Sequence, residues 1–383
     1  MSATELLSAA RNLRELIESE ADEVEQTSTM TAPVVDALAD AGLFQLCVPE
    51  ELGGAEADAA TIIEVCEELS FADGSVGWAY AQNTTVMAYA AYLEPEYALP
   101  LVRSKAAAGV FAPLGIAYKD NGGYRVSGSW AFGSGSGHAE YMGGACMEMD
   151  GEEMAPFIDD LPQIRAFIIP MDRVNMKGNW DVMGLRGTGS YDFDVPEQLV
   201  EAGATFPVFQ THVITGGPIY GIGAVPLGTI SSTAWALGVA RRALHEIAQI
   251  GIGGRTRLGS LPLREQPTFQ RDFGIHKAAV KAARLLADDA YASAVDAVAR
   301  GLSPQELAAR VRDTKAAASY VTRVAKAAVT FAYESSGSKG MRNPCRLQRC
   351  FRDIYVGSAH QVFDDRNYNQ IARPDLEIEP EPF

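Results

Sequence analysis

Apolar residues recur at helical spacing over the first hundred positions of the chain. Leu6, Ala10, Leu13 and Ile17 mark the first such stretch, and this spacing predicts a helix from Glu5 to about Asp22. The same spacing predicts further helices over residues 32–41, 59–70, 75–92 and 95–104. We therefore expect residues 1–107 to form an N-terminal helical domain.

The pattern changes near Gly109, where short apolar runs begin to alternate with turn residues. Asn121-Gly122-Gly123 stands directly before the alternating apolar residues Tyr124 and Val126, which is typical of a β-hairpin. This pattern continues to about residue 202. It predicts a middle β domain over residues 108–212, built as a barrel or a sandwich.

Alanine-rich helical stretches return after a cluster of glycine and proline over residues 215–226. Four helices of about twenty residues, joined by short loops, are typical of an antiparallel bundle. Ser303 and Glu306 form a capping box at the start of one of these helices, and the last is predicted from Leu347 to about Phe363. We expect this C-terminal four-helix bundle to occupy residues 213–383.

The composition argues against several classes of function. The chain has 383 residues, of which 47% are hydrophobic, and 49 acidic residues outnumber 32 basic ones to give a net charge of −17. Such a surface repels phosphate backbones, so no nucleic-acid partner is expected. No basic-then-apolar leader and no apolar run of the roughly 20 residues that a membrane span needs is visible, so we expect a cytoplasmic protein without membrane contact. The five cysteines are scattered and the histidines form no ligand motif, so no metal site is predicted.

The order of helical domain, β domain and bundle resembles the acyl-CoA dehydrogenase fold, a mainly α fold with a central β domain. Three runs carry the resemblance: GLRGTGSYDFDV at 184–195 followed by Pro196, GVARRALHEI at 238–247, and NPCRLQRCFRDIYVGSAH at 343–360. The resemblance also implies a homotetramer with the bundles at its centre. Long helices that bury more than one face suit that assembly.

The catalytic base of ordinary acyl-CoA dehydrogenases is missing from both of its usual places. Eight residues beyond Asp353, where such enzymes carry a glutamate, this chain has Gln361, and residues 227–238 contain no acid. Removing a proton from a thioester α-carbon requires a positioned base. An acyl-CoA dehydrogenase or oxidase with a displaced base is therefore the alternative reading, and a scaffold that has lost its cofactor is a second one.

Residues 128–138, GSWAFGSGSGH, and His360 together resemble another branch of the same fold. That branch comprises the oxygenase components of two-component flavin-dependent monooxygenases, which include 4-hydroxyphenylacetate, hydroxylated-steroid and dibenzothiophene oxygenases. The resemblance implies reduced FMN or FAD as cofactor, O2 as co-substrate and a C4a-hydroperoxyflavin that hydroxylates an aromatic or polycyclic small molecule. It also implies a separate NAD(P)H-dependent flavin reductase, and the chain indeed has no dinucleotide-binding fingerprint.

The resemblance assigns the flavin contacts to two segments. In the first, Trp130 and Phe132 are expected to alternate on one strand face and wall the isoalloxazine, Ser134 to reach N5 or the peroxide, and Gly135 to allow close backbone approach. An inward-facing core role for the two aromatic residues is the alternative. The second segment and a loop arginine supply the remaining expected cofactor contacts: Arg186, Thr188, Ser190 and, from a neighbouring subunit, Arg255. A polar turn stabilised by hydroxyl side chains is the alternative for Ser190.

His360 is the predicted catalytic residue, together with Ser134. With the resemblance, its expected role is general base toward a phenolic or similar proton, and stabilising the peroxide is a second option. Without it, a lone histidine on a helix would be taken as structural. Trp78 and Asn83, on the helix predicted over 75–92, are expected to contact the substrate.

Overall fold

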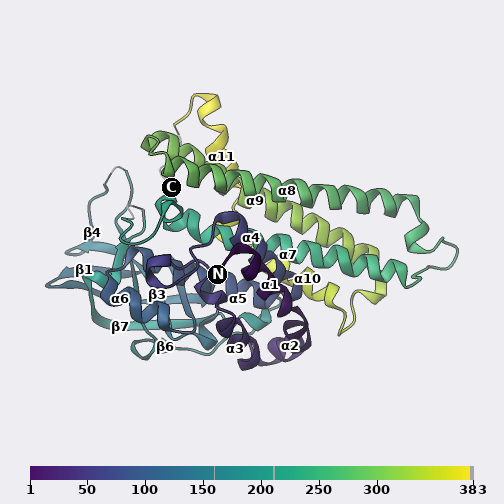
Figure 1. Ribbon diagram of the computed structural model, residues 1–383, viewed down its shortest axis with the longest axis horizontal. Helices are drawn as coiled ribbons and strands as arrows, with labels where there is room; N and C mark the ends of the chain where they lie inside the picture. Colours follow the sequence, from purple (N-terminus) through teal and green to yellow (C-terminus); the bar gives the residue numbers. More distant parts are fainter. Residues whose placement is uncertain (159, 210–211, 380–383) are drawn as a thin grey trace.

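The N-terminal third of the computed structural model is helical, as its apolar spacing predicts, and the structure describes residues 1–158, 160–209 and 212–379 (Figure 1). The expected first helix is interrupted at Leu13, which ends one helix and precedes the next. Residues 380–383 of the predicted bundle domain lie outside the described residues. The helices of this part are α1 (Ala3–Asn12), α2 (Arg14–Thr27), α3 (Ala32–Asp40), α4 (Ala59–Ala72), α5 (Gly74–Ala88) and α6 (Pro95–Arg103).

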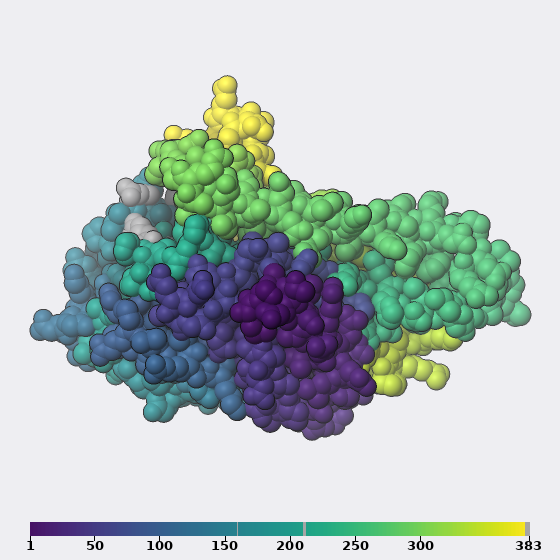
Figure 2. Space-filling view, in the orientation of Figure 1, coloured from purple at the N-terminus to yellow at the C-terminus, as the bar shows by residue number. Residues whose placement is uncertain are grey.

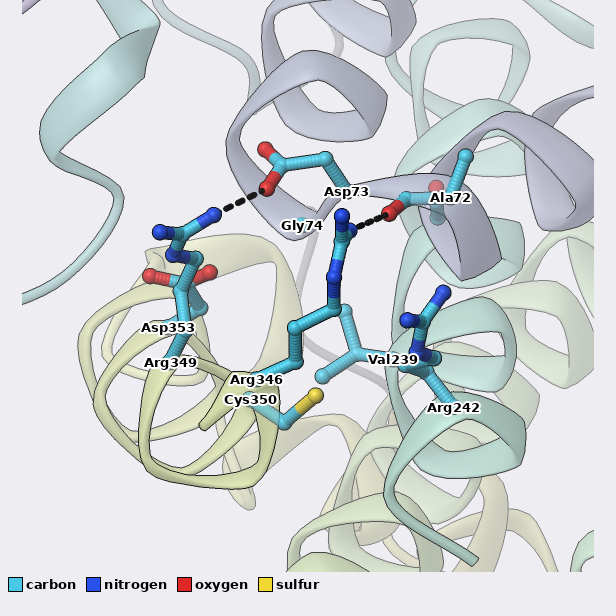
Figure 3. A pocket seen from close by; sticks show the side chains of 10 residues that line it. Ala72, Asp73, Gly74, Val239, Arg242, Arg346, Arg349, Cys350 and Asp353 are labelled. Atoms are coloured by element: carbon cyan, nitrogen blue, oxygen red, sulfur yellow. Dashed lines mark hydrogen bonds and ion pairs between the residues drawn. The ribbon is translucent and has the colours of Figure 1, made fainter. Parts of the chain in front are cut away.

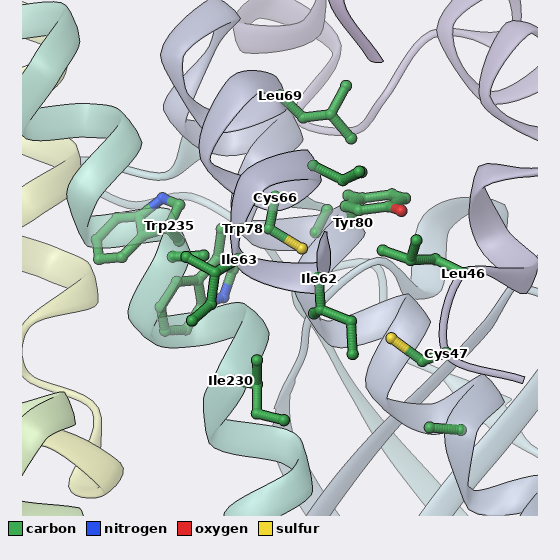
Figure 4. Close-up of a cluster of buried hydrophobic side chains, with 14 of the residues drawn as sticks. Leu46, Cys47, Ile62, Ile63, Cys66, Leu69, Trp78, Tyr80, Ile230 and Trp235 are labelled. Atoms are coloured by element: carbon green, nitrogen blue, oxygen red, sulfur yellow. The ribbon is translucent and has the colours of Figure 1, made fainter. Parts of the chain in front are cut away.

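Helix α5 lies at the centre of the molecule and is buried on nearly every face. Its start is fixed by Asp73, whose carboxylate accepts the N–H groups of Ser75 and Val76. Trp78 on α5 and residues of α4 pack against the bundle in one hydrophobic cluster, where Figure 4 shows Trp78 beside Trp235. This cluster anchors the helical part of the site described below.

The strands form one mixed eight-stranded sheet in the described residues, rather than the predicted barrel or sandwich. Strand β1 pairs antiparallel with β2 and parallel with β3, so it lies inside the sheet, whose order is β6-β7-β2-β1-β3-β5-β8 with β4 beside β3. The predicted hairpin is confirmed: Asp120 pairs with Gly123 and Gly122 has a φ of 84°. The strands are β1 (Ala107–Asp120), β2 (Gly123–Gly133), β3 (Tyr141–Asp150), β4 (Glu153–Met154), β5 (Ile164–Pro170), β6 (Asn175–Met176), β7 (Tyr191–Glu201) and β8 (Thr205–Pro207).

The C-terminal helices are more unequal than expected. Three are long, with 29, 33 and 33 residues: α7 (Ala224–Ile252), α8 (Pro267–Ala299) and α9 (Pro304–Ser336). The capping box of Ser303 and Glu306 is confirmed at the start of α9. Helix α10 (Arg346–Gly357) has only 12 residues and ends before His360, and α11 (Arg366–Ala372) follows. The predicted last helix to Phe363 is therefore too long, because the chain turns extended at His360.

The bundle extends well beyond the rest of the molecule, away from the sheet (Figures 1 and 2). Helix α7 packs along α4 and α5, and α5 in turn contacts strand β1 of the sheet. The candidate site described below lies where the N-terminal helices, the sheet and the C-terminal helices meet. Within the described ranges, no helix is long and apolar enough to cross a membrane. The domain boundaries near residues 107 and 212 stay a prediction.

Candidate active site

Four side chains from three separate segments form one hydrogen-bonded chain. The indole Nε1–H of Trp78 donates to Ser134 Oγ at 3.0 Å, and Ser134 Oγ lies 2.8 Å from Ser190 Oγ. Ser190 Oγ lies 2.6 Å from Thr188 Oγ1, which donates to the carbonyl of Leu185 at 2.9 Å. We refer to Ser134, Ser190 and Thr188 as the hydroxyl chain.

The two loops that carry the hydroxyl chain are held together by backbone contacts. The N–H of Gly135 donates to the carbonyl of Thr188 at 2.8 Å, and Gly135 has a φ of 79°, which favours glycine. A Cβ at Gly135 would collide with the side chain of Asn83. The predicted need for a glycine here thus has a physical cause, although the contact is with Asn83.

Asn83 is fully buried, with 0% of its surface exposed, and both ends of its amide are bonded. It donates to the carbonyl of Ala107 and pairs with Nε2 of His138 at 2.8 Å, and burial lowers the pKa of His138 to about 4. Asn83 therefore has no exposed surface for the predicted substrate contact in this structure. It ties α5 to the start of β1 and to the loop after β2.

Trp130 and Phe132 do not share a strand face, so that part of the predicted flavin wall is wrong. The pairing of β2 with β7 shifts register between Trp130 and Gly133, and Phe132 takes a φ of 70°. Trp130 is 1% exposed and stacks on Phe193 inside the sheet's own core. Phe132, by contrast, is 66% exposed, so it can still contact a flavin.

An aromatic pair, the exposed Phe132 and the half-buried Trp180, lies near the hydroxyl chain. Trp180 meets Phe132 edge-to-face at 6.0 Å between ring centroids, and its indole N–H donates to the carbonyl of Leu185. Asp192 on β7 accepts the N–H of Phe132 and the side-chain amide of Asn179, the residue directly before Trp180. The sequence reading missed Trp180, which stands alone in a polar loop with no periodic pattern to mark it.

His360 lies just beyond α10, at the start of a short 3₁₀ turn of residues 361–363. Its ring meets the Trp78 indole edge-to-face at 5.6 Å between centroids, so Trp78 separates it from Ser134. Phe363 packs against the same indole. The structure thus brings the predicted residues His360, Trp78 and Ser134 into one line of contacts.

Surrounding protein atoms lower the pKa of the His360 imidazole to about 4 by desolvation, although the residue is exposed at the surface, so the neutral ring is the expected form at physiological pH. Its Nδ1 accepts the backbone N–H of Val362 at 3.3 Å. In the neutral ring the proton therefore resides on Nε2, which is a donor. A general base would need a free lone pair at that nitrogen, so the geometry favours a hydrogen-bond donor over the predicted base.

The Arg352-Asp353 pair joins α10 to the loop that carries Thr188 and Ser190. Arg352 donates to the carbonyl of Met183 and binds Glu25, while Asp353 accepts the N–H of Leu185 at 2.6 Å. Asp353 is 1% exposed, and burial followed by the charge of Asp73 raises its pKa to about 7.

A cavity of about 10 Å³, room for roughly one water, lies beside Asp353. Around it, Arg349 bonds to Asp73, and Arg346 bonds to the carbonyl of Ala72 (Figure 3). These bonds hold α10 against the junction of α4 and α5.

The remaining predicted cofactor contacts differ in their surroundings. Thr188 and Ser190 are 0% and 2% exposed, so neither has surface for a direct flavin contact. Arg186 is paired with Glu25 and Asp181. Arg255 belongs to the segment between α7 and α8, which lies at the end of the bundle away from the sheet (Figure 1), so within one chain this segment does not reach the hydroxyl chain.

Comparisons with known proteins place this architecture. A family model described as "Acyl-CoA dehydrogenase, N-terminal domain" matches residues 4–94, and one described as "Acyl-CoA dehydrogenase, C-terminal domain" matches residues 230–365, together more than half of the chain. The chain belongs to the acyl-CoA dehydrogenase family.

Curated relatives of this family member are monooxygenases. It is 28% identical to the indole-3-acetate monooxygenase of Pseudomonas putida, over 90% of this chain and 87% of the relative. It is 26% identical to the flavin-dependent monooxygenase oxygenase subunit HsaA of Mycobacterium tuberculosis, over 94% and 92% of the two chains. It is also 28% identical to the FADH(2)-dependent resorcinol hydroxylase oxygenase component of a Rhizobium species, over 98% and 95%.

Solved structures agree on the fold. The crystal structure of HsaA from M. tuberculosis superposes with a TM-score of 0.90 at 22% identity, covering 100% of both chains. A complex of TdsC from Paenibacillus sp. A11-2 with FMN and indole superposes with a TM-score of 0.77 at 20% identity, covering 97% of both. The predicted acyl-CoA dehydrogenase-like fold is thus confirmed.

Proposed function

We propose that this member of the acyl-CoA dehydrogenase family is the oxygenase component of a two-component flavin-dependent monooxygenase. The observation that carries the proposal is the hydroxyl chain, which ends at Ser134, two residues from the exposed Phe132 and its half-buried partner Trp180. Curated relatives that align over nearly their whole length are monooxygenases, two of them named as oxygenase components. The cofactor is reduced FMN or FAD, which a separate NAD(P)H-dependent reductase supplies.

The residues at this site fit a flavin. Phe132, at 66% exposure, offers a flat apolar face, and Ser134 keeps 7% of its surface exposed for one polar contact. When bound, the reduced flavin supplies the activation of O2 and the transfer of one oxygen atom to the substrate. Trp78 holds Ser134 in place, and the bonds of Arg352 and Asp353 hold the loop around Thr188.

His360 orients the substrate on the other side of Trp78. Its Nε2–H donates a hydrogen bond to an oxygen of the substrate, which suits a phenol or a related polar aromatic molecule. The rings of Trp78 and Phe363 give that molecule apolar contacts beside the histidine. An aromatic or polycyclic substrate is the class that this combination recognises.

The assembly we propose is a homotetramer formed through the bundles. Ile275, Leu285 and Leu286 on α8 and Tyr320 on α9 are exposed apolar residues on the long helices. Burying them between subunits removes apolar surface from water. Arg255 is 9% exposed and its guanidinium lies against Gly337, so it would have to turn outward to reach the phosphates of a neighbour's flavin. Light scattering at micromolar concentration should give four times the chain's mass.

The alternative function is an acyl-CoA dehydrogenase or oxidase with a displaced base. Asp353, the carboxylate that α10 carries ahead of His360, is buried and bonded to Leu185, so it does not supply that base. A yellow protein whose flavin is bleached by an acyl-CoA would favour the alternative over the monooxygenase.

The direct test of the proposal adds a flavin reductase to the purified protein. Alone, the protein should not oxidise NADH, and with reductase, FMN or FAD and O2 it should hydroxylate phenols or indoles. The reaction is expected in the cytoplasm, where the reductase has NAD(P)H. Rapid NADH oxidation without the reductase would contradict a two-component enzyme.

A further inference from the structure

The hydroxyl chain has a direction, because each hydroxyl carries only one proton to donate. Thr188 donates to the carbonyl of Leu185, so it accepts from Ser190. Ser190 has then given its proton to Thr188 and accepts from Ser134. Ser134 in turn accepts the indole N–H of Trp78. In this direction every proton of the hydroxyl chain has an acceptor.

The reverse direction leaves one proton without an acceptor inside the protein. If Thr188 donated to Ser190 and Ser190 to Ser134, the bond from Thr188 to the Leu185 carbonyl would be lost. The Leu185 carbonyl would still accept the indole N–H of Trp180 and the backbone N–H of Thr188, so it would not be left without a hydrogen bond. The proton of Ser134, however, would point outward without a partner. The first direction is therefore favoured by about one hydrogen bond.

Only one member of the hydroxyl chain can touch a ligand. Thr188 and Ser190 are 0% and 2% exposed, whereas Ser134 retains 7%. With its proton committed to Ser190 and one lone pair committed to Trp78, Ser134 Oγ keeps one lone pair for a ligand. The site is thus built to accept a hydrogen bond and not to donate one.

We propose that Ser190 and Thr188 are positioning residues that make this site select reduced over oxidised flavin, by fixing Ser134 as an acceptor. The inference rests on the proposed function, in which Ser134 meets flavin N5. In the reduced ring N5 carries a hydrogen and donates to Ser134, whereas in the oxidised ring N5 offers only a lone pair. Oxidised flavin can be bonded only if the hydroxyl chain reverses and gives up the Leu185 bond.

The size of the preference follows from that single bond. One net hydrogen bond corresponds to about 2- to 12-fold in a binding constant, so this is the expected contribution to the ratio of dissociation constants for oxidised and reduced flavin. A tenfold change in this ratio equals roughly 30 mV in the two-electron midpoint potential of the bound flavin. Both quantities can be measured without turnover.

The experiment compares Ser190→Ala, Thr188→Val and Ser136→Ala. Ser190→Ala frees the proton of Ser134 to donate to oxidised N5, and Thr188→Val removes the acceptor that sets the direction. Ser136 is the matched control, because its buried hydroxyl donates to the carbonyl of Gly189 in the same loop pair and stands outside the hydroxyl chain. Dissociation constants are measured by titration with FMN in air and with dithionite-reduced FMN under nitrogen.

The two test variants should bind oxidised FMN more tightly, so the ratio of dissociation constants for oxidised and reduced FMN should fall by about 2- to 12-fold. The midpoint potential of bound FMN should fall with this ratio. Ser136→Ala should keep the wild-type ratio. A wild-type ratio in folded Ser190→Ala and Thr188→Val would overturn the inference and leave the proposed function standing. Failure of the wild-type protein to bind either form of FMN or FAD would overturn the proposed function itself.

Discussion

Replacing His360 tests whether this histidine donates a hydrogen bond or removes a proton. Its pKa is lowered to about 4 and its Nδ1 accepts the N–H of Val362, so the neutral ring with the proton on Nε2 is the form expected to act. Loss of a hydrogen-bond donor at a reacting oxygen costs about 10²- to 10³-fold in kcat. Loss of a general base costs about 10²- to 10⁴-fold, so His360→Ala lowers the rate under either role.

His360→Gln separates the two roles. A glutamine side chain can place an N–H near the position of Nε2, but an amide does not accept a proton at neutral pH. If His360 is a donor, His360→Gln should keep kcat within about tenfold of wild type, well above His360→Ala. The assay is a single turnover with pre-reduced flavin, measuring hydroxylated product against released H2O2. Equal loss of product in both variants would refute the donor role.

Three further substitutions test the surrounding structure. Burial raises the pKa of Asp353 to about 7, so the folded protein holds a proton that the unfolded chain releases above about pH 4. The free energy of unfolding should therefore fall by up to ~1.4 kcal/mol per pH unit between pH 4 and 7. Urea denaturation at several pH values should show a weaker dependence of this free energy on pH in Asp353→Asn. Asp192→Ala should loosen Phe132 and Trp180 and so weaken the binding of reduced FMN by about 2- to 12-fold, the worth of one hydrogen bond. Asp194→Ala is the control, because Asp194 lies on the same strand but bonds Ser129 and Lys177. An equal loss of FMN affinity in both variants would contradict the aromatic contact. Asn83→Ala should lower the free energy of unfolding by about 1–3 kcal/mol and leave KM for substrate unchanged; a raised KM in a fully stable variant would restore Asn83 as a substrate contact.

The fold could be predicted from the sequence because its signals are local and repeated. The helical spacing of residues 59–70, the turn at Asn121-Gly122 and the capping box at Ser303 each specify a short element, and the structure confirms them. Their order then resembled one fold, which the family models confirm. The arrangement of the strands in one mixed sheet was not predictable in this way, since it depends on which distant strands pair.

The site was harder to predict because its geometry depends on irregular backbone. Alternation along a strand predicted one face for Trp130 and Phe132, but the register shift and the positive φ at Phe132 turn the two rings to opposite environments. The motif around Thr188 predicted direct flavin contacts, whereas the burial of Thr188 and its bond to Ser190 are the basis of our proposal that it acts through Ser134. Trp180 carried no signal, because a single tryptophan in a loop has no periodicity.

The measurement that tests the central claim most directly supplies the reduced flavin without any reductase. Photoreduced FMN or FADH2 is mixed with the purified protein, a phenolic or indolic substrate and ¹⁸O2, and the product is analysed by mass spectrometry. We predict one ¹⁸O atom in the hydroxylated product with no NAD(P)H present. Product that forms only when NAD(P)H is added directly to this protein, or that carries its oxygen from water, would contradict the account.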